Sequence, residues 1–213
     1  MRFRRKARPA APIAVPTARP SPADEPGEAP GVDIDAFARA VDPERLDETQ
    51  FVQLIDVLDM LGRTGTGIEL AKMRTDTFVW FVSRASTSQL ELLMAHGHLR
   101  HVVFGEIFRR MSEHLDPVRA ADLRAIVHWR FTGGTGHGGY DRFQTHIDSG
   151  TCTSGRHPTA DARVTLTLSP VDFLRAVTGT ANVAMLFMRG KVKVRGDIAF
   201  AAGLINYFDL PKP

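Results

Sequence analysis

Three histidines in a short span are the first candidates for chemistry: His96, His98 and His101. Imidazole nitrogens are common zinc ligands. The three lie on both sides of an expected helix break at Gly97, and no carboxylate or cysteine stands at a spacing that would complete a zinc site. We therefore interpret them as surface histidines and expect no metal site.

Two histidines, a cysteine and two serines are the candidates for nucleophilic chemistry. His128, His146 and Cys152 fall on neighbouring predicted strands. A Cys–His catalytic pair needs a pocket and an orienting group, whereas the polar face of the sheet should be open to water. Ser149 and Ser154 each precede a glycine, but neither lies in a Gly-x-Ser-x-Gly elbow. We expect no catalytic residue, and a protein that is not an enzyme.

The glycine-rich stretch from Gly133 to Gly139 invites comparison with a phosphate-binding loop. Such loops present backbone N–H groups at the start of a helix, where the helix dipole favours an anion. Here the stretch joins two predicted strands, so we interpret it as a hairpin connection. No cofactor is expected.

Composition limits the classes of protein that fit. The chain has 213 residues, of which 43% are hydrophobic, which suits one domain with an appendage or two small domains. A single cysteine excludes an internal disulfide and suits a reducing compartment, so we expect a cytoplasmic location. No apolar run reaches the length of about 18 residues that a membrane span needs.

Residues 1–32 differ from the rest of the chain in charge and proline content. The first 19 residues carry cations without any acid, and outside them 21 cations stand against 24 acids, so a nucleic-acid partner is not expected. Regularly spaced prolines predict a disordered tail. The tail would be a solubilising segment, a docking peptide for a protein partner or a contact with an anionic membrane surface. Its cations are Arg2, Arg4, Arg5, Lys6, Arg8 and Arg19.

Residues 33–84 are predicted to form a helical appendage. Apolar residues at helical spacing follow Asp47, which would cap the helix. The run Phe78–Val82 fits a buried strand or a packed helix, and periodicity does not decide between them. Beyond the appendage, Ser88 stands at capping-box spacing from Glu91 and is expected to begin the next helix.

Alternating apolar and polar residues predict five strands from residue 127 onward. The segments are 127–131, 140–148, 151–156, 164–168 and 191–195. We expect an α+β fold: a five-stranded, mainly antiparallel sheet with helices covering one face and the other face open to water.

The C-terminal segment is rich in apolar residues. Ser169-Pro170 is expected to begin a helix that Gly179 ends, and Asp197 to cap the last helix. Between them lies the run Met185–Met188, whose thioethers suit an irregular ligand. From the residues alone this apolar set is either a closed core, which composition favours, or a binding surface.

The same segment carries a resemblance. Its elements follow one another in the order Thr178-Gly179 to Asn182, Leu186-Phe187-Met188, Gly190-Lys191-Val192-Lys193-Val194 to Gly196-Asp197, and a helix around Ala201 and Leu204. This order resembles the C-terminal half of the sterol carrier protein type 2 family. The likeness extends over roughly residues 88–213, so a lipid-binding domain is expected at residues 85–213.

The resemblance implies a lipid carrier with a hydrophobic tunnel under a C-terminal helix that acts as a lid. The ligand would be a sterol-like, isoprenoid or fatty-acyl lipid, delivered by transient contact with a membrane surface. Lys191, Lys193 and Arg195 would meet a head group or form a solvated strand face, and we prefer the latter. The alternative is a non-enzymatic scaffold protein, recruited through residues 1–84, whose tunnel has collapsed to a core. The tunnel residues implied are Trp129, Phe173, Leu174, Val177, Met185, Leu186, Phe187, Met188, Phe200, Leu204 and Phe208.

Overall fold

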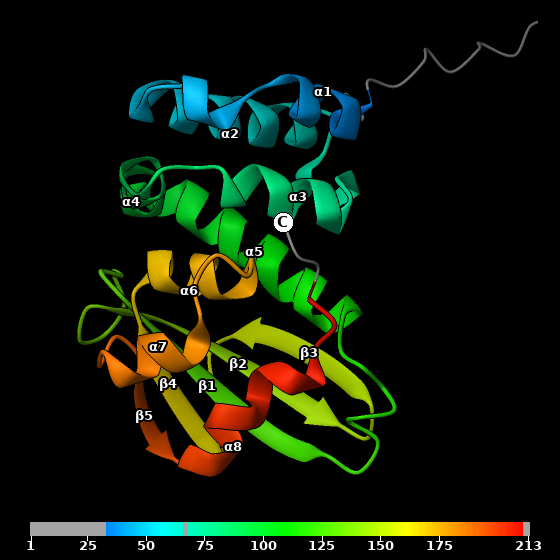
Figure 1. The fold of residues 1–213 in the computed structure, drawn as a ribbon, viewed down its shortest axis with the longest axis vertical. Coiled ribbons are helices and arrows are strands. Elements are labelled where there is room, and N and C mark those ends of the chain that lie inside the picture. Colours follow the sequence, from blue (N-terminus) through cyan, green and yellow to red (C-terminus); the bar gives the residue numbers. More distant parts are fainter. Residues whose placement is uncertain (1–32, 66–67, 211–213) are drawn as a thin grey trace, which may run out of the picture. The chain divides into compact units, whose positions relative to one another are not determined.

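A five-stranded sheet organises the computed structural model, which describes residues 33–65 and 68–210. The tail predicted for residues 1–32 lies outside the described residues. The strands follow the order β3-β2-β1-β4-β5 (Figure 1). All neighbouring strands are antiparallel except β1 and β4, which are parallel. Their bounds are β1 Arg124–Thr132, β2 Tyr140–Asp148, β3 Thr151–Arg156, β4 Val164–Leu168 and β5 Lys193–Gly196.

Side-chain alternation along β1 shows why this segment forms a strand with one covered face. Val127, Trp129 and Phe131 are buried, whereas His128 and Arg130 between them are only half-buried. Strand residues two apart share a face, so the apolar series meets the helices and the polar series faces away. The predicted α+β fold with a mainly antiparallel sheet is confirmed. The last strand begins at Lys193, two residues after the predicted start.

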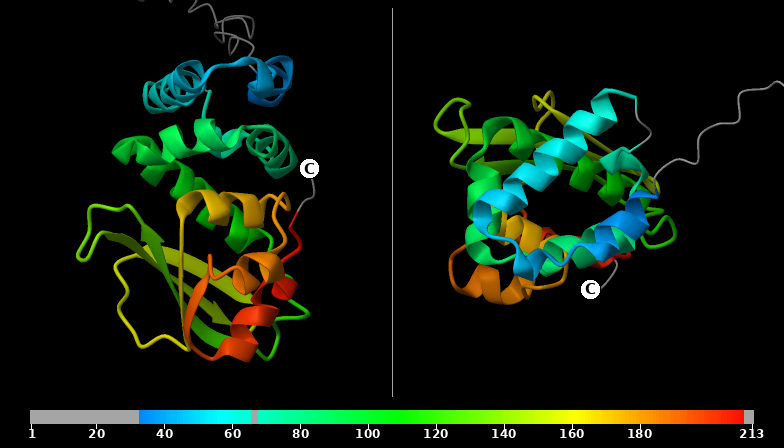
Figure 2. Two further views of the ribbon diagram at one scale, coloured as in Figure 1. Left: turned by 60° about the vertical axis from the view of Figure 1, so that its left-hand side comes forward. Right: turned by 90° about the horizontal axis from the view of Figure 1, so that it is seen from above.

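Helices that follow residue 96 in the chain cover the apolar face of the sheet (Figures 1 and 2). Aromatic rings join the two layers: the Phe104 ring lies 4.2 Å from that of Phe131, and the Phe173 ring 4.9 Å from Phe131, between centroids. Such offset contacts add to the hydrophobic gain of burial. The covering elements are α5 Gly97–Glu113, α6 Pro170–Val177, α7 Val183–Met188, α8 Ile198–Gly203 and the 3-10 turn η3 Leu204–Tyr207.

The chain before α5 is helical, as predicted, and the ambiguous run Phe78–Val82 is part of a helix, α3. Phe78, Val79, Phe81 and Val82 are all buried, because α3 packs within the helical layers rather than at a surface. The elements are α1 Ile34–Ala40, η1 Pro43–Arg45, α2 Glu48–Arg63, η2 Leu70–Lys72, α3 Thr75–Ser83 and α4 Thr87–Ala95. None of the described helices combines the length and apolar character needed to cross a membrane.

The cap of α4 differs from the prediction. Ser86, not Ser88, is the N-cap residue, and it forms a reciprocal capping box with Gln89. Both serines stand three residues before a suitable partner. Tertiary contacts favour Ser86 as the cap, because the side-chain amide of its partner Gln89 also donates to the carbonyls of Pro43 at 2.9 Å and Leu46 at 2.7 Å.

Buried polar contacts connect residues 33–84 to α4 and α5. The Arg110 guanidinium of α5, which is buried, donates to the carbonyl oxygens of Leu70 at 2.9 Å and Met73 at 2.8 Å. One cluster of buried apolar side chains runs from Ile34 to Phe208, and the described residues form one compact unit. The domain boundary predicted between residues 84 and 85 stays a prediction.

Candidate functional site

A cavity of about 70 Å³ lies between the sheet and the C-terminal helices. Its walls come from five regions of the chain: α5, the strands β1 and β4, α6, α7, and the segment from Val192 through η3 to Leu210. All fifteen lining side chains are apolar. The indole N–H of Trp129 is satisfied by the Thr145 hydroxyl at 2.9 Å, so it presents no unpaired donor to the cavity. Such a cavity suits hydrocarbon, and its lining side chains offer a ligand no unpaired polar group.

Six of the sequence-predicted residues line this cavity. They come from β1, α6, α7 and the C-terminal segment, which are separated by up to 79 positions in the chain. The parallel pairing of β1 with β4 places Trp129 opposite Leu166 and so forms the floor. The six are Trp129, Phe173, Val177, Leu186, Leu204 and Phe208.

Met185, Phe187 and Met188 lie elsewhere, with 40%, 44% and 74% of their surface exposed. The reason is local: Asn182 caps a helix by accepting from the Met185 N–H at 3.1 Å, so residues 183–188 form α7 rather than a loop. Residues three apart share a helix face. Val183 and Leu186 therefore face the cavity, and the other large side chains face outward.

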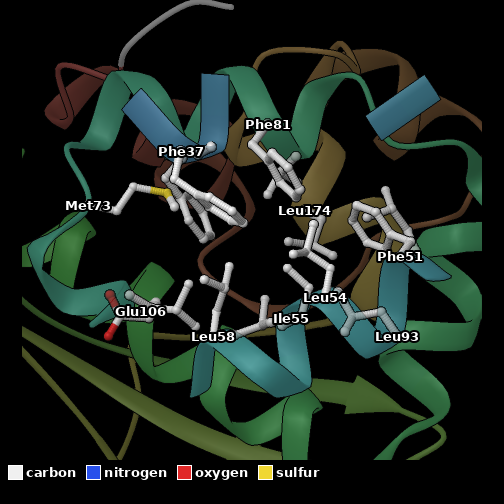
Figure 3. A pocket seen from close by; sticks show the side chains of 16 residues that line it. Phe37, Phe51, Leu54, Ile55, Leu58, Met73, Phe81, Leu93, Glu106 and Leu174 are labelled. Atoms are coloured by element: carbon white, nitrogen blue, oxygen red, sulfur yellow. The ribbon is translucent and has the colours of Figure 1, made fainter. Parts of the chain in front are cut away.

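Leu174 and Phe200 are buried but do not line the cavity. Leu174 lies on the other side of α6, where it joins a second cavity of about 30 Å³ beneath α1 and α2. Figure 3 shows this cavity, with Leu174 pointing toward Phe51 and Phe81 from the appendage. Phe200 instead packs under Arg163, whose guanidinium carbon lies 4.3 Å from the centre of its ring.

Nine lining residues were not predicted. Leu166 and Leu168 share the covered face with Trp129, so strand alternation alone would have found them. Met111 reaches the cavity from the C-terminal end of α5, and only tertiary packing brings it there. The others are Ala176, Val183, Val192, Ala201, Ile205 and Leu210.

The sequence of this region decides the family. Residues 104–209 match the model of the SCP-2 sterol transfer family. The chain belongs to this family. The matched residues, here called the SCP-2 region, include every residue of the cavity except Leu210.

Individual relatives match parts of the chain. The fatty acid-binding protein of Yarrowia lipolytica is 45% identical over 49 residues, which are 23% of this chain and 38% of that protein. The sterol carrier protein 2 of Yarrowia lipolytica, solved in its apo form, is 25% identical with a TM-score of 0.37, covering 53% of this chain and 92% of that one. The sec-alkylsulfatase Pisa1 of Pseudomonas sp. is 15% identical with a TM-score of 0.44, covering 83% of this chain and 30% of that one.

The candidate chemical groups outside the cavity do not converge in the SCP-2 region. His128 and His146 share the open face of the sheet, whereas Cys152 pairs with Ile147 on the covered face. Cys152 lies 3.8 Å from the Ser112 hydroxyl of α5, and burial raises the pKa of its thiol. A thiol with a raised pKa is a poor nucleophile. Within residues 33–65 and 68–210, no group of histidine, cysteine and acidic side chains has the arrangement of a metal site.

Asp197 fixes the start of α8 and so positions the cavity wall that Ala201 and Leu204 form. Its carboxylate accepts from the Phe200 N–H at 2.8 Å and from the Arg163 Nε at 2.9 Å. The Phe200 hydrogen bond, and then the Arg163 guanidinium, hold the pKa of Asp197 below its ordinary value. Both contacts favour the charged carboxylate over the protonated one, so protonation of Asp197 should weaken them.

We predict that acid weakens this end of α8 and that Asp197→Asn removes part of the effect. A depressed folded-state pKa contributes stability above the unfolded pKa of about 3.9, and that stability is lost as pH falls through the folded pKa. Asparagine also caps a helix but does not titrate in this range. Chemical denaturation between pH 6 and pH 3 should therefore show a shallower loss of stability below about pH 4 for the variant. Equal slopes for both proteins would contradict this role of Asp197.

Proposed function

We propose that the chain is a lipid-binding carrier that holds a sterol-like, isoprenoid or fatty-acyl ligand in an enlarged form of this cavity. The observation that supports it best is the position of a wholly apolar cavity within the SCP-2 region, beneath helices at the C-terminal end. The family description concerns sterol transfer, and the matching Yarrowia lipolytica relative is named a fatty acid-binding protein. Both descriptions fit a ligand that is mostly hydrocarbon.

The cavity must grow to accept a lipid. Its volume of about 70 Å³ compares with about 300–1,000 Å³ for typical ligand sites. One of its walls is α7, a helix of six residues that contributes only Val183 and Leu186. Leu186 is buried, yet it does not belong to the continuous core cluster of the described residues. We propose that displacement of α7 and α8 enlarges the cavity into a tunnel.

Burial of hydrocarbon is sufficient to drive such binding. Each methylene that leaves water contributes about 0.8 kcal/mol, so a dozen contribute about 10 kcal/mol. Micromolar affinity corresponds to about 8 kcal/mol. Association and displacement of the wall reduce the gross gain. The affinity expected for an acyl chain is therefore micromolar rather than nanomolar.

The same cavity supports a function without catalysis. None of its lining side chains is a nucleophile, an acid or a base. A bound hydrocarbon would contact methyl, methylene and aromatic groups alone. We therefore propose that the SCP-2 region carries its ligand and leaves it chemically unchanged.

The alternative is a non-enzymatic scaffold whose tunnel has collapsed to a core. The small volume of the cavity favours it, as does the firm attachment of the helical appendage through Arg110 and Gln89. In this case residues 1–84 would recruit a protein partner and no lipid would enter.

Native mass spectrometry of the full chain, followed by lipid extraction, distinguishes the two proposals. A carrier should retain a discrete hydrophobic adduct, whereas a scaffold should show the bare mass. A fluorescent acyl probe gives a second readout, because Trp129 lines the cavity and Trp80 does not. In a Trp80→Phe variant, we expect emission from Trp129 to transfer to bound parinaric acid.

The matched control is Trp129→Phe, which keeps Trp80 on α3, whose ring centre lies 5.8 Å from the Arg39 guanidinium carbon and 5.5 Å from that of Arg84. Trp80 does not line the cavity, so its transfer to the probe should be weaker than that from Trp129. A bare mass together with no transfer from Trp129 would refute the carrier proposal. Transfer from Trp129 that is no stronger than transfer from Trp80 would count against binding in the cavity.

A further inference from the structure

The outer side of α7 exposes three large apolar side chains. Met188 has 74% of its surface exposed, Phe187 44% and Met185 40%. We call these three residues the α7 surface. Single exposed apolar residues are ordinary, whereas three within one helix of six residues form a patch of the kind that marks an interaction site.

The inner side of the same helix is the cavity wall. Val183 and Leu186 line the cavity, while Met185 and Met188 point away from it. At this point a single helix of six residues separates the cavity from solvent. A partner that takes up the outer side chains of α7 therefore acts directly on this wall of the cavity.

The stretch of chain that contains α7 carries charge of one sign. From Phe173 to Gly196 the chain has no acidic residue and carries Arg175, Arg189, Lys191, Lys193 and Arg195. Lys191 pairs with Asp172 at 3.1 Å. Within the part of the chain that the structure describes, Arg189, Lys193 and Arg195 are exposed and make no ion pair. Arg189 directly follows α7, and Lys193 and Arg195 lie on the edge strand β5.

Exposed apolar groups beside unpaired cations fit a lipid bilayer with anionic headgroups. Cations attract the negative surface, and Phe and Met side chains enter the boundary between headgroups and acyl chains. We propose that the α7 surface docks on an anionic bilayer and that this docking draws α7 from the sheet, opening the cavity to lipid. The opening step rests on the proposed carrier function, whereas the docking step does not.

The test is a fluorophore placed on α7. An environment-sensitive label on Met188→Cys, in a Cys152→Ser background, reports whether this position leaves water. The label should shift to the blue on vesicles of phosphatidylcholine with phosphatidylglycerol and stay unchanged on phosphatidylcholine alone. The matched control is Val118→Cys, which is 83% exposed on the turn after α5 and should show no shift.

The cations give a second, quantitative test. Replacing Lys193 and Arg195 with glutamine should raise the vesicle concentration needed for half of the shift about 25-fold, since each cation near an anionic surface contributes about fivefold. Residues 1–32 are the same in both proteins, so their cations cancel in the comparison.

Three outcomes would overturn the docking proposal. In the first, the label on position 188 stays in water although the chain sediments with anionic vesicles. In the second, the emission of labels on positions 118 and 188 shifts equally. In the third, the label on position 188 is already shielded in a dimer without vesicles, which would make a second copy of the chain the partner of the α7 surface. The label reports only whether α7 leaves water, whether or not a lipid enters the cavity. Insertion of α7 in a chain that binds no lipid probe would therefore uphold docking while refuting the carrier function.

Discussion

Asp141→Ala is expected to lower the free energy of unfolding by about 3–5 kcal/mol, because it leaves a buried guanidinium without its counter-ion. Arg100 and Asp141 are 5% and 8% exposed, and the Arg100 Nε lies 2.5 Å from the Asp141 carboxylate. Urea denaturation at neutral pH measures the loss directly. A fall of this size would leave the chain marginally stable.

The other contacts of Arg100 explain why the loss should be large. Its guanidinium also donates to the carbonyl oxygens of Met94 at 3.1 Å and Thr132 at 2.7 Å, so it ties α4 and β1 to α5. The glycine loop packs closely on Asp141, since a Cβ at Gly134 would lie 2.6 Å from the Asp141 carboxylate carbon. Without Asp141 the arginine keeps both carbonyl partners and cannot simply turn toward water.

The double variant Arg100→Met/Asp141→Leu is the matched control. Replacing both members of a buried ion pair by apolar residues of similar size is often neutral. The double variant should therefore be more stable than Asp141→Ala alone. If Asp141→Ala costs less than about 1 kcal/mol, or if the double variant is the less stable protein, the pair does not have this role.

Local patterns predicted most of the sheet, because each strand carries its own alternation. Val127, Trp129 and Phe131 alternate whatever their neighbours are, and burial follows the same pattern. The parallel pairing of β1 with β4 depends on the connection 157–163 crossing to the far side of β1, where Arg163 donates to the Ile126 carbonyl at 2.9 Å. No local pattern specifies that crossing.

The site was harder to predict than the fold, because the direction of a side chain decides whether its residue lines a cavity. The run Met185–Met188 is uniformly apolar, but α7 turns only Leu186 of that run inward. Leu174 and Phe173 are neighbours on α6 that face different cavities. When a helix is packed on two sides, an apolar residue is buried whichever side it faces. Composition therefore could not tell which cavity such a residue lines.

Filling the cavity is expected to weaken lipid binding more than tenfold without unfolding the protein. Ala201 lies on α8, is half-buried and lines the cavity. In Ala201→Phe a ring would take the space from which the proposed tunnel grows. Filling a cavity commonly adds about 0.5–2 kcal/mol of stability, while overpacking costs about 1–3 kcal/mol. Titration with parinaric acid measures the affinity, and thermal unfolding of the same sample measures the stability.

The two readouts together separate a filled cavity from a damaged fold. A variant that loses affinity because it unfolds must show a lower melting temperature, whereas a filled cavity loses affinity at an unchanged or higher one. Ala95→Phe, at the exposed end of α4, adds the same ring away from the cavity and should bind the probe as the parent does. If Ala201→Phe is folded and still binds with unchanged affinity, the ligand does not occupy this cavity. The carrier function would then need another site, and the small volume beneath α7 would be a packing defect of a scaffold protein.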